Sequence, residues 1–280
     1  AMKKIKKNSE KVAFSIVMII LLLIAAIELV PFLWMFMSGF KSNSELLLDP
    51  FAFPETWLVN NYQRAWVNGI GKYLLNSIWV TGVSTVLTLV FSILAAYPIA
   101  RIKFKYSKAA LIFVMSGLML APMVAMIPLY KILIGTHLYD TYWAMIIPYV
   151  AFRLPFTIFL IWSFFIGIPK DIEESAIIDG CSPAGVLWRI FVPLSKPIIS
   201  AAGMLAVRTF WNELMFALCF TQNAKLKTVP VGLLSLKSSM ETEWPVLIAG
   251  LALSCVPVVI VYLLFQKQLI RDMTSGGVKG

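Results

Sequence analysis

The sequence is poor in the residues from which catalytic and metal sites are usually built. Among its 280 residues it has one histidine and three cysteines, Cys181, Cys219 and Cys255. An odd number of cysteines without a regular spacing argues against a disulfide framework and against a metal site. The sequence also lacks the Gly-x-x-x-x-Gly-Lys-Ser/Thr loop that holds ATP phosphates. We therefore expect no ATP, Mg²⁺ or other cofactor to be bound by this chain itself.

Long polar stretches are scarce as well. Hydrophobic residues make up 60% of the chain and the mean hydropathy is +0.84, and a soluble domain cannot hide that much apolar surface from water. A membrane-spanning helix needs roughly 20 apolar residues. The sequence predicts one all-α, polytopic membrane domain over residues 1–280, with six spans near residues 13–37, 74–100, 109–133, 141–167, 198–222 and 244–267.

Acidic residues are outnumbered, with 14 Asp and Glu against 24 Lys and Arg. The net charge of +10 could indicate nucleic-acid binding, but its distribution follows the positive-inside rule. With the N-terminus in the cytosol, 15 Lys and Arg residues fall in cytosolic segments and 7 in outer ones. We therefore predict two cytosolic termini, contact with lipid and none with nucleic acid. The first apolar block, Val12–Phe36, is too long for a signal peptide and is interpreted as the first span.

Three features of the predicted spans and loops have structural consequences. Prolines recur in the spans, where each removes a backbone hydrogen bond and bends the helix axis. Before the second span, a short interfacial helix is expected around Asn60–Val67. The basic segment Arg101–Lys108 is interpreted only as a topology signal that contacts lipid headgroups.

Four charged residues fall inside the predicted spans: Glu28, Arg153, Arg208 and Glu213. Charges at membrane depth are costly unless they are paired or face water, so each is a functional candidate. Arg208 and Asn212 are four residues apart and share one face of the fifth span. Glu213 is displaced by about 140° around the axis from Arg208, so these two are not expected to pair within the helix.

The segment Pro169–Pro197, between the fourth and fifth spans, predicts two short helices joined by a turn. Pro169 and the acidic residues after it are typical of a helix N-terminus. Gly180 supplies a C-terminal stop. Ser182 is then suited to cap a second helix, which ends before Pro193.

Helices of about nine residues are too short to be stable alone in water, so this pair needs a partner surface. Ile172, Ala176 and Ile177 give the first helix a narrow apolar face. Lipid headgroups, the protein's own spans, or a groove on a cytosolic partner could each cover that face.

The same segment resembles the "EAA" loop of ABC importer permeases. The family pattern is Glu-Ala-Ala, three positions, Gly, nine positions, Ile, one position and Leu-Pro. The matching residues here are Glu174-Ser175-Ala176, Gly180, Ile190 and Val192-Pro193. Ser175 and Val192 depart from the pattern, and both are small or apolar replacements.

Further similarity extends along nearly the whole chain to the carbohydrate, maltose-type branch of that family. The matching stretches are FPETWLVNNYQRAW in the first outer segment, Trp211-Asn212-Glu213 in the fifth span, and GGVKG at residues 276–280. The resemblance implies one permease subunit in the cytoplasmic (inner) membrane of a prokaryote. Its implied partners are a second, homologous permease subunit, two cytosolic ATPase subunits that bind ATP and Mg²⁺, and an extracytoplasmic solute-binding protein.

The resemblance also implies roles for particular residues. ATP hydrolysis belongs to the partners, so this chain is not expected to be an enzyme. Coupling to the ATPases is assigned to the loop 169–197, with Glu174 as a charge contact and Gly180 setting the angle between the helices. The implied coupling residues are Glu174, Ser175, Ala176, Asp179, Gly180, Ile190 and Pro193. The tail residues Gly276, Gly277, Val278 and Lys279 are expected to slip between the ATPases, unless they form a disordered terminus.

The charged and polar residues of the spans fit a solute pathway. Sugars are bound by planar polar groups and aromatic faces, which suits Trp211 and Asn212. The residues predicted to face the translocation path or the partner permease are Arg153, Arg208, Trp211, Asn212 and Glu213. The solute is expected to be a sugar or oligosaccharide, with a polyol, a glycerol phosphate or an oligosaccharide-derived acid as alternatives. Two water-accessible arginines would favour an anionic solute.

Two readings from other classes fit the sequence less well. A membrane-embedded enzyme would need a cluster of His with Asp or Glu, or of Ser with His, at membrane depth, and the predicted spans contain none. A stand-alone channel leaves the helix pair of Pro169–Pro197 without a purpose.

Overall fold

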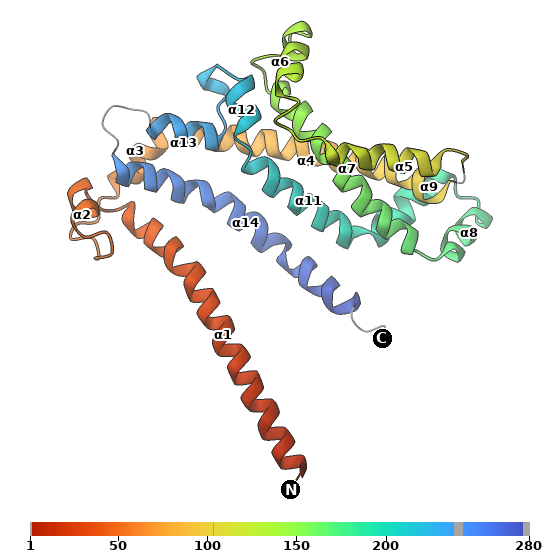
Figure 1. The fold of residues 1–280 in the computed structure, drawn as a ribbon, viewed down its shortest axis with the longest axis horizontal. Helices are drawn as coiled ribbons and strands as arrows, with labels where there is room; N and C mark the ends of the chain where they lie inside the picture. The colour runs from red at the N-terminus through yellow and green to blue at the C-terminus, as the bar shows by residue number, and fades with distance from the viewer. Residues whose placement is uncertain (1, 103, 238–242, 277–280) are drawn as a thin grey trace. The chain divides into compact units, whose positions relative to one another are not determined.

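The computed structural model describes residues 2–102, 104–237 and 243–276. Every regular element in this part of the chain is a helix (Figure 1), which confirms the all-α class. The chain divides into two compact units. The first comprises Ala1–Ile70 and Ser235–Cys255, and the second comprises Gly71–Leu234 and Val256–Gly280.

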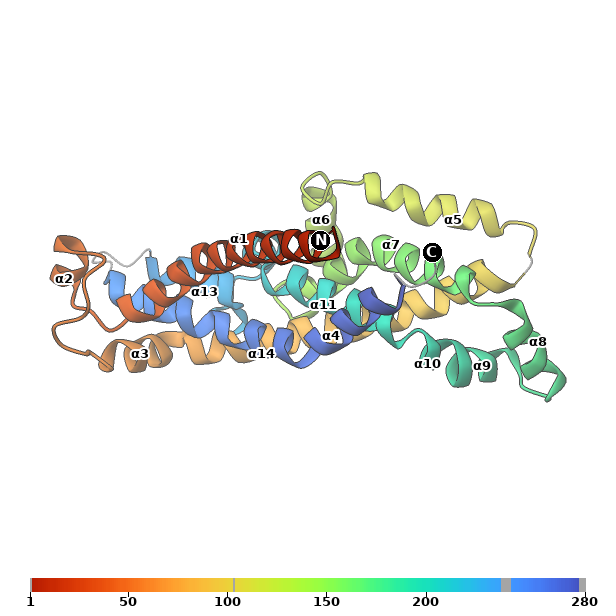
Figure 2. The ribbon, with the colours of Figure 1, turned by 90° about the horizontal axis from the view of Figure 1, so that it is seen from below.

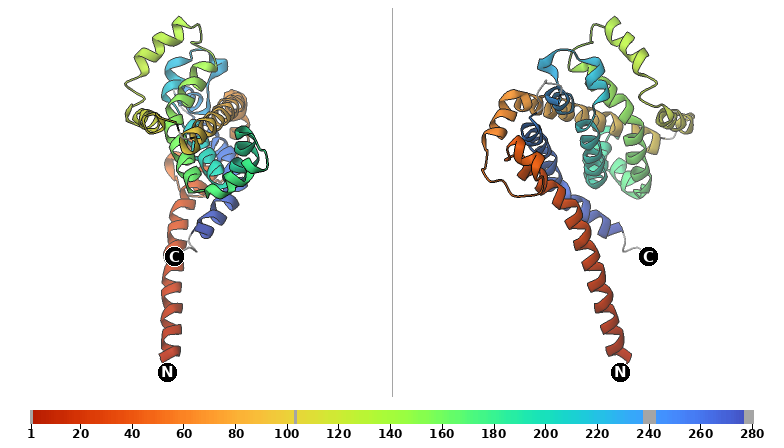
Figure 3. Two further views of the ribbon diagram at one scale, coloured as in Figure 1. Left: turned by 90° about the vertical axis from the view of Figure 1, so that its right-hand side faces the viewer. Right: turned by 60° about the vertical axis from the view of Figure 1, so that its left-hand side comes forward.

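The first unit begins with α1, Met2–Ser38, a single continuous helix (Figure 3). This helix contains a candidate membrane span, Phe14–Ser38. The most apolar part of that span has no buried residue within the described chain. Glu28 lies on this helix and is exposed. An apolar helix surface of this size is suited to lipid or to another chain.

The segment after α1 is fixed by side chains that bond to the backbone. Lys41 is fully buried, and its Nζ donates to the carbonyl oxygens of Asp49 and Pro50 at 3.0 and 2.9 Å. The Asn61 amide donates to the carbonyl oxygens of Gly39 and Lys41 at 3.0 and 2.8 Å. The short helices of this segment leave backbone carbonyl groups without a partner inside the helix. These side chains take the place of water as the hydrogen-bond donors to those groups. The helices are α2 (Asn43–Leu48), α3 (Asn60–Ala65) and the π-turn η1 (Trp66–Ile70).

The expected interfacial helix at Asn60–Val67 is therefore present as α3, but it does not stand alone. It continues through η1 directly into α4, Gly71–Arg101. Gly69 lies in η1 with a φ of 124°, a conformation that L side chains rarely adopt, and it marks the kink at this junction.

Three helices build the centre of the second unit. α4 packs mainly against α7, Trp143–Gly167, and α11, Lys196–Trp211, packs against both (Figures 1 and 2). Small side chains recur along the buried face of α4 at intervals of three or four residues, which lets neighbouring backbones approach closely in lipid. These buried residues are Ser77, Thr81, Ser84, Thr88, Ser92 and Ala96.

Two apolar clusters fill this unit. The first joins α4 and α7 to the end of α11 and to α12 through residues such as Met145, Phe210 and Phe216. The second contains Phe165 of α7 and Phe191 of the segment 169–197. The second cluster therefore connects the spans to the helix pair, which lies beside the C-terminal ends of α4 and α7 in Figure 2.

The six predicted spans are not all continuous helices. Within the described residues, four helices are long and apolar enough to cross a membrane, or five if the pair Pro183–Leu194 and Lys196–Trp211, bent by 77°, counts as one span. The third predicted span, 109–133, is broken. It consists of α5 (Ser107–Ser116), the 3₁₀ turn η2 (Gly117–Met119) and α6 (Met126–Gly135).

The break in the third predicted span has a local cause. Leu120 is extended, and Pro122 disfavours the helical conformation of the residue before it. The fifth predicted span breaks near Asn212 and resumes as α12, Met215–Phe220. The count of six thus remains a prediction.

Proline does not end the other long helices, because Pro31, Pro98, Pro148, Pro155 and Pro257 all lie inside them. The remaining elements are η4 (Ala224–Leu226), α13 (Val229–Lys237) and α14 (Trp244–Gly276). Gly276 ends α14, whereas the expected contact residues Gly277, Val278 and Lys279 lie outside the described residues.

Candidate functional site

The first half of the segment 169–197 is α8, Lys170–Ile178, with Asp171 and Glu173 in its first turn as expected. Gly180 ends it with a φ of 82°. The N–H of Gly180 donates to the carbonyl of Ile177 at 3.0 Å, and the N–H of Cys181 donates to that of Ala176 at 2.9 Å. This is the hydrogen-bond pattern of a Schellman cap, so the predicted glycine stop is confirmed in position and in conformation.

The second half begins at Ser182, as predicted. Its Oγ accepts the N–H of Gly185 at 3.2 Å, and Pro183 occupies the first turn. The helix does not end before Pro193, however. It continues as α9 (Pro183–Val186), the π-turn η3 (Leu187–Phe191) and α10 (Val192–Leu194).

The π-turn explains how this helix tolerates Pro193. A proline ring inside an α-helix collides with the carbonyl group four residues earlier, here that of Arg189. In η3 the ladder widens, because the N–H of Val192 donates to the carbonyl of Leu187, five residues back.

The protein's own spans cover one face of the helix pair. Ala176 of α8 is 6% exposed, and Val186 and Phe191 of the second helix are fully buried. The ring of Phe191 meets Tyr97 and Phe165 edge-on, with centroid distances of 5.1 and 5.3 Å. Of the expected apolar face of α8, only Ala176 is buried, since Ile172 and Ile177 remain exposed.

A charged anchor that was not foreseen from the sequence strengthens this attachment. Arg101, the last residue of α4, forms an ion pair with Glu173 at 3.6 Å and donates to the carbonyl oxygen of Ile168. Its guanidinium group lies over the Phe191 ring at 4.9 Å, and the Tyr97 hydroxyl bonds to Glu173 at 3.3 Å. The Arg101 side chain is only 4% exposed, so interpreting it as a mere topology signal is wrong.

The other face of the pair is open to solvent. Glu174 is exposed, as are Ile178, at 85%, and Trp188, at 48%. Ser175 bonds back to the carbonyl of Asp171 at 2.7 Å. Where the pair meets the end of α7, a hollow of about 420 Å³ is lined by Ser163, Phe164, Gly167, Ile168, Pro169, Ile172 and Leu194.

The remaining expected coupling residues take mixed positions. Ala176 and Gly180 serve the internal structure of the pair, as a buried contact and a turn. Asp179 and Pro193 are exposed and Ile190 is partly buried. The residues on the open face, rather than the full motif, are thus the ones available to another protein.

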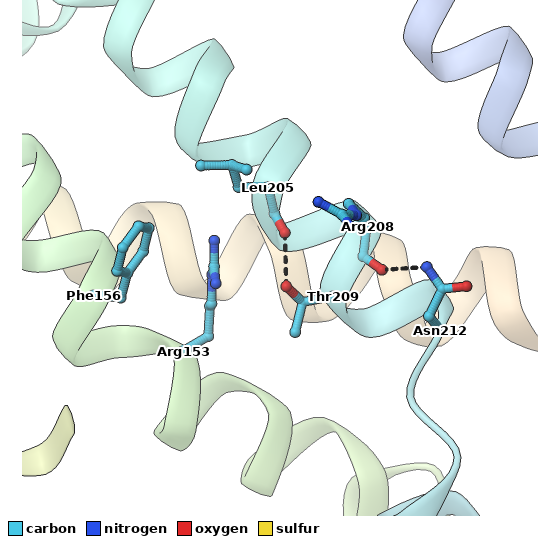
Figure 4. Close-up of a pocket in the computed structure, with 6 residues that line it drawn as sticks. All are labelled: Arg153, Phe156, Leu205, Arg208, Thr209 and Asn212. Atoms are coloured by element: carbon cyan, nitrogen blue, oxygen red, sulfur yellow. Dashed lines mark hydrogen bonds between the residues drawn. The ribbon is translucent and has the colours of Figure 1, made fainter. Parts of the chain in front are cut away.

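A second candidate site is a cavity of about 490 Å³ between α7 and α11. It brings together three of the residues expected to face a solute path, Arg153, Arg208 and Asn212. In Figure 4, Arg153 and Phe156 project from α7, Leu205, Arg208 and Thr209 project from α11, and Asn212 follows directly as the C-cap of α11. The lining residues are Arg153, Phe156, Leu205, Arg208, Thr209 and Asn212.

The hydrogen bonds of the cavity leave both arginine head groups without an acidic partner in the described residues. The amide of Asn212 donates to the carbonyl of Arg208 at 2.9 Å, and Thr209 donates to that of Leu205 at 2.8 Å. The guanidinium carbon of Arg153 lies 4.5 Å from the Phe156 ring centroid. Arg208 and Asn212 therefore share a face, as their spacing predicted.

The other two expected path residues do not reach this cavity. Trp211 is 7% exposed and is absent from the lining. Glu213 accepts the N–H groups of Phe216 and Ala217 at 2.9 and 3.3 Å, so its carboxylate caps α12. In the described part of the chain, no group of three or more His, Cys, Asp or Glu is placed to hold a metal.

Comparisons with a family model and with individual known proteins point to the same protein family. Residues 88–275 match the family model described as "Binding-protein-dependent transport system inner membrane component". The chain is 44% identical to a probable ABC transporter permease protein, YurM, of Bacillus subtilis, over 89% of this chain and 83% of YurM. It is 36% identical to the trehalose/maltose transport system permease protein MalG of Thermococcus litoralis, over 92% and 94% of the two chains.

The fold is also shared with a solved structure. A crystal structure of a bacterial ABC transporter involved in the import of the acidic polysaccharide alginate matches with a TM-score of 0.80. The match covers 91% of this chain and 95% of the other at 22% identity, and at this identity the likeness concerns the fold.

Proposed function

Because this chain belongs to the family of binding-protein-dependent transport system inner membrane components, we propose that it is one permease subunit of an ATP-driven importer for a sugar or oligosaccharide. The family is a membrane permease family, so the chain's own task is to provide part of a path across the membrane. The saccharide is supported by the trehalose/maltose permease among its relatives and by the maltose-type sequence motifs.

The observation that carries the coupling mechanism is the construction of the helix pair. One face is fixed to α4 and α7 by Arg101 and Phe191, while Ile178, Trp188 and Glu174 remain open. A pair fixed in this way transmits a push on its open face to the spans as a rigid body. Exposed apolar side chains together with acidic ones suit a groove with a basic rim on a cytosolic ATPase.

The mechanism follows from that attachment. ATP binding draws two cytosolic ATPase subunits together, and a helix pair seated in one of them moves with it. Arg101 and the Phe191 cluster pass the movement to α4 and α7. Because the cavity lies between α7 and α11, a tilt of α7 changes access to Arg153 and Arg208.

Other subunits complete the importer. A second, related permease provides the other half of the path, the ATPases bind ATP and Mg²⁺, and an extracytoplasmic binding protein delivers the solute. In this arrangement the chain lies in the cytoplasmic membrane of a prokaryote with both termini in the cytosol. The tail 276–280 adds a further contact to the ATPases.

The decisive test is the ATPase activity of the complex reconstituted from this chain, its neighbouring permease, its ATPase and its binding protein. We expect stimulation by binding protein loaded with one member of a saccharide panel. A flat response across saccharides, with an assembled complex, contradicts the proposed substrate class. Failure of the ATPase to co-purify contradicts the docking role of Pro169–Pro197.

Glu174 gives a sharper test of the open face. Glu174→Lys reverses an exposed charge without touching the anchored face, so we expect the chain to insert normally and to lose association with the ATPase. Lys131→Glu is the matched control, because Lys131 is exposed on α6, away from the pair. Equal co-purification of ATPase with both variants would remove Glu174 from the contact.

A further inference from the structure

Two arginines that belong to apolar helices line one cavity, Arg153 half-buried and Arg208 exposed, and the described residues supply neither with a counter-charge. The described chain contains two ion pairs, Arg64 with Glu243 and Arg101 with Glu173. The acidic residue nearest in sequence to the end of α11, Glu213, is engaged with the first N–H groups of α12. The sequence of α7 has no Asp or Glu, and neither does that of α11.

Placing an unpaired guanidinium group at membrane depth costs free energy. Charged residues at that depth therefore commonly mark the path of a substrate or an ion. The Nε of Arg153 is buried and has no hydrogen-bond partner in the described residues. The Phe156 ring beside it offers a cation–π contact, which is weaker than pairing with an anion. The lining of the cavity therefore carries two positive charges and no acidic side chain.

The rest of the lining suits the hydroxyl groups of a saccharide. Asn212 uses one N–H on the carbonyl of Arg208, which leaves its amide oxygen free to accept. Thr209 has given its hydroxyl hydrogen to the carbonyl of Leu205, so its oxygen is also left as an acceptor. A volume of about 490 Å³ is within the range of small-molecule sites.

From these residues we propose that the cavity between α7 and α11 binds an acidic saccharide. Its carboxylate, or an equivalent anionic group, is held by Arg153 and Arg208, and its hydroxyls donate to Asn212 and Thr209. This inference rests on the proposed importer function and narrows its substrate class from sugars in general to sugars that bear an anion. Arginine matches such a group because its planar fork can donate two parallel hydrogen bonds to one carboxylate.

The test uses the complete importer in proteoliposomes, supplied with its own binding protein. The probes are radiolabelled digalacturonate and the neutral galactose disaccharide of the same linkage. We expect ATP-dependent uptake of the acidic probe, and a fall of about tenfold or more for Arg153→Gln and for Arg208→Gln, since a hydrogen bond to a charged group is lost in each. Arg208→Lys should retain part of the activity, because it keeps the charge and loses the fork.

Lys131→Gln is the matched control, since it removes an exposed positive charge of α6 that lies outside the cavity. Its uptake of digalacturonate should equal that of the unchanged importer. The subunit composition of each variant is measured by co-purification, so that a loss of assembly is distinguished from a loss of binding.

Several results would overturn the inference while leaving the importer function intact. The first is wild-type uptake of the neutral probe alone. The second is an Arg153→Gln or Arg208→Gln complex that loses its partner permease, which would assign the arginines to a subunit interface. The third is an effect of these variants only in vesicles that contain phosphatidylglycerol, which would assign them to lipid phosphate. If no saccharide drives uptake or ATPase activity in the unchanged complex, the proposed function itself fails.

Discussion

At the end of α4, the Arg101 side chain contacts three separate parts of the second unit, namely Glu173, the carbonyl of Ile168 and the ring of Phe191. Removing this charge leaves the Glu173 carboxylate, 17% exposed, without its cation. We expect Arg101→Gln to lower the free energy of unfolding by about 1–3 kcal/mol. Thermal unfolding of the purified complex measures the loss.

The same substitution should also weaken coupling, because the helix pair loses its charged attachment to the spans. ATP hydrolysis would then continue with less uptake per ATP. Lys108→Gln is the control, since Lys108 is an exposed basic residue of the same loop region. If Arg101→Gln leaves both stability and the ratio of uptake to hydrolysis unchanged, Arg101 is not a positioning residue for the pair.

A substitution of Glu213 can show whether its charge stabilises a helix or contacts the transported solute. Its carboxylate accepts two N–H groups at the start of α12. We therefore expect Glu213→Ala to destabilise this helix by about 1 kcal/mol and to leave the relative uptake of acidic and neutral saccharides unchanged. Hydrogen exchange at Phe216 and Ala217 reports the cap, and faster exchange at both amides is expected. A changed solute preference would instead place Glu213 in the path.

The residue-level expectations succeeded where the chemistry is local. Arg208 and Asn212 are one helical turn apart, and their shared face follows from the period of the helix. The Arg101 anchor was missed because Arg101 and Ile168 are 67 positions apart and only the packing of α4 on α7 brings them together. One signal was available, since Glu173 is three residues before the buried Ala176 and so shares its inward face.

At the scale of single elements, Gly180 controls the turn between α8 and α9. Its φ of 82° is unfavourable for any residue with an L side chain. A Cβ atom at this position would not clash with a neighbour, because no atom lies within 4 Å of it. Gly180→Ala should therefore cost about 1–2 kcal/mol from backbone conformation alone, and weaken ATPase association by misdirecting the pair. Chemical denaturation and co-purification measure the two effects.

Gly167→Ala is the matched control for this turn. Gly167 also has free space at its Cβ position, but its φ is not positive, and it is the last residue of α7. We expect it to be neutral or slightly stabilising, because alanine favours the helix. If both variants behave alike, conformational strain at Gly180 is not what sets the turn.

The start of α2 carries a pH-dependent element. The N–H of Ser42 donates to Glu45 at 2.6 Å, and this bond, together with that of the Ser42 hydroxyl, lowers the pKa of Glu45 below its ordinary value of 4.5. A lowered folded-state pKa means that the stabilisation is complete above the ordinary pKa and is lost as pH falls through the lowered value. The amide protection factors of α2 should fall over that acidic range.

Ser42→Ala supplies the control for the capping box. It removes the hydroxyl bond and should leave α2 less protected at neutral pH, with a weaker dependence on pH. Protection factors in the unchanged protein that stay constant from pH 7 to pH 3 would show that the Glu45 carboxylate does not stabilise this helix.

The sequence predicted the ends of helices best where one or two residues determine where a helix stops or starts. Gly180 and Ser182 mark their boundaries through their own backbone and hydroxyl chemistry, so the sequence is sufficient there. The third predicted span failed as one helix because hydropathy measures length and apolarity, and α5 and α6 are both apolar. Whether a proline is accommodated inside a helix, as Pro98 is, or lies in a break, as Pro122 does, depends on neighbours that satisfy the backbone.

For the whole molecule, the distribution of Lys and Arg predicts which side of the membrane each loop faces, and α11 separates two loops that should lie on opposite sides. The pair 169–197 is expected in the cytosol and the segment after α12 outside. In a background with all three native cysteines changed to Ser, Lys225→Cys should react with an impermeant maleimide added to intact cells, because Lys225 is exposed.

The complementary variant restores only Cys181, which is partly exposed in the turn of the helix pair. It should stay unlabelled in intact cells and react once the membrane is permeabilised, because the helix pair is expected to face the cytosol. The ATPase that is proposed to dock on the pair is on that side as well. The reverse pattern would invert the molecule and place the exposed residues Ile178 and Trp188 where no ATPase can reach them. Coupling by the helix pair and the positive-inside orientation therefore stand or fall on the same pair of labelling reactions.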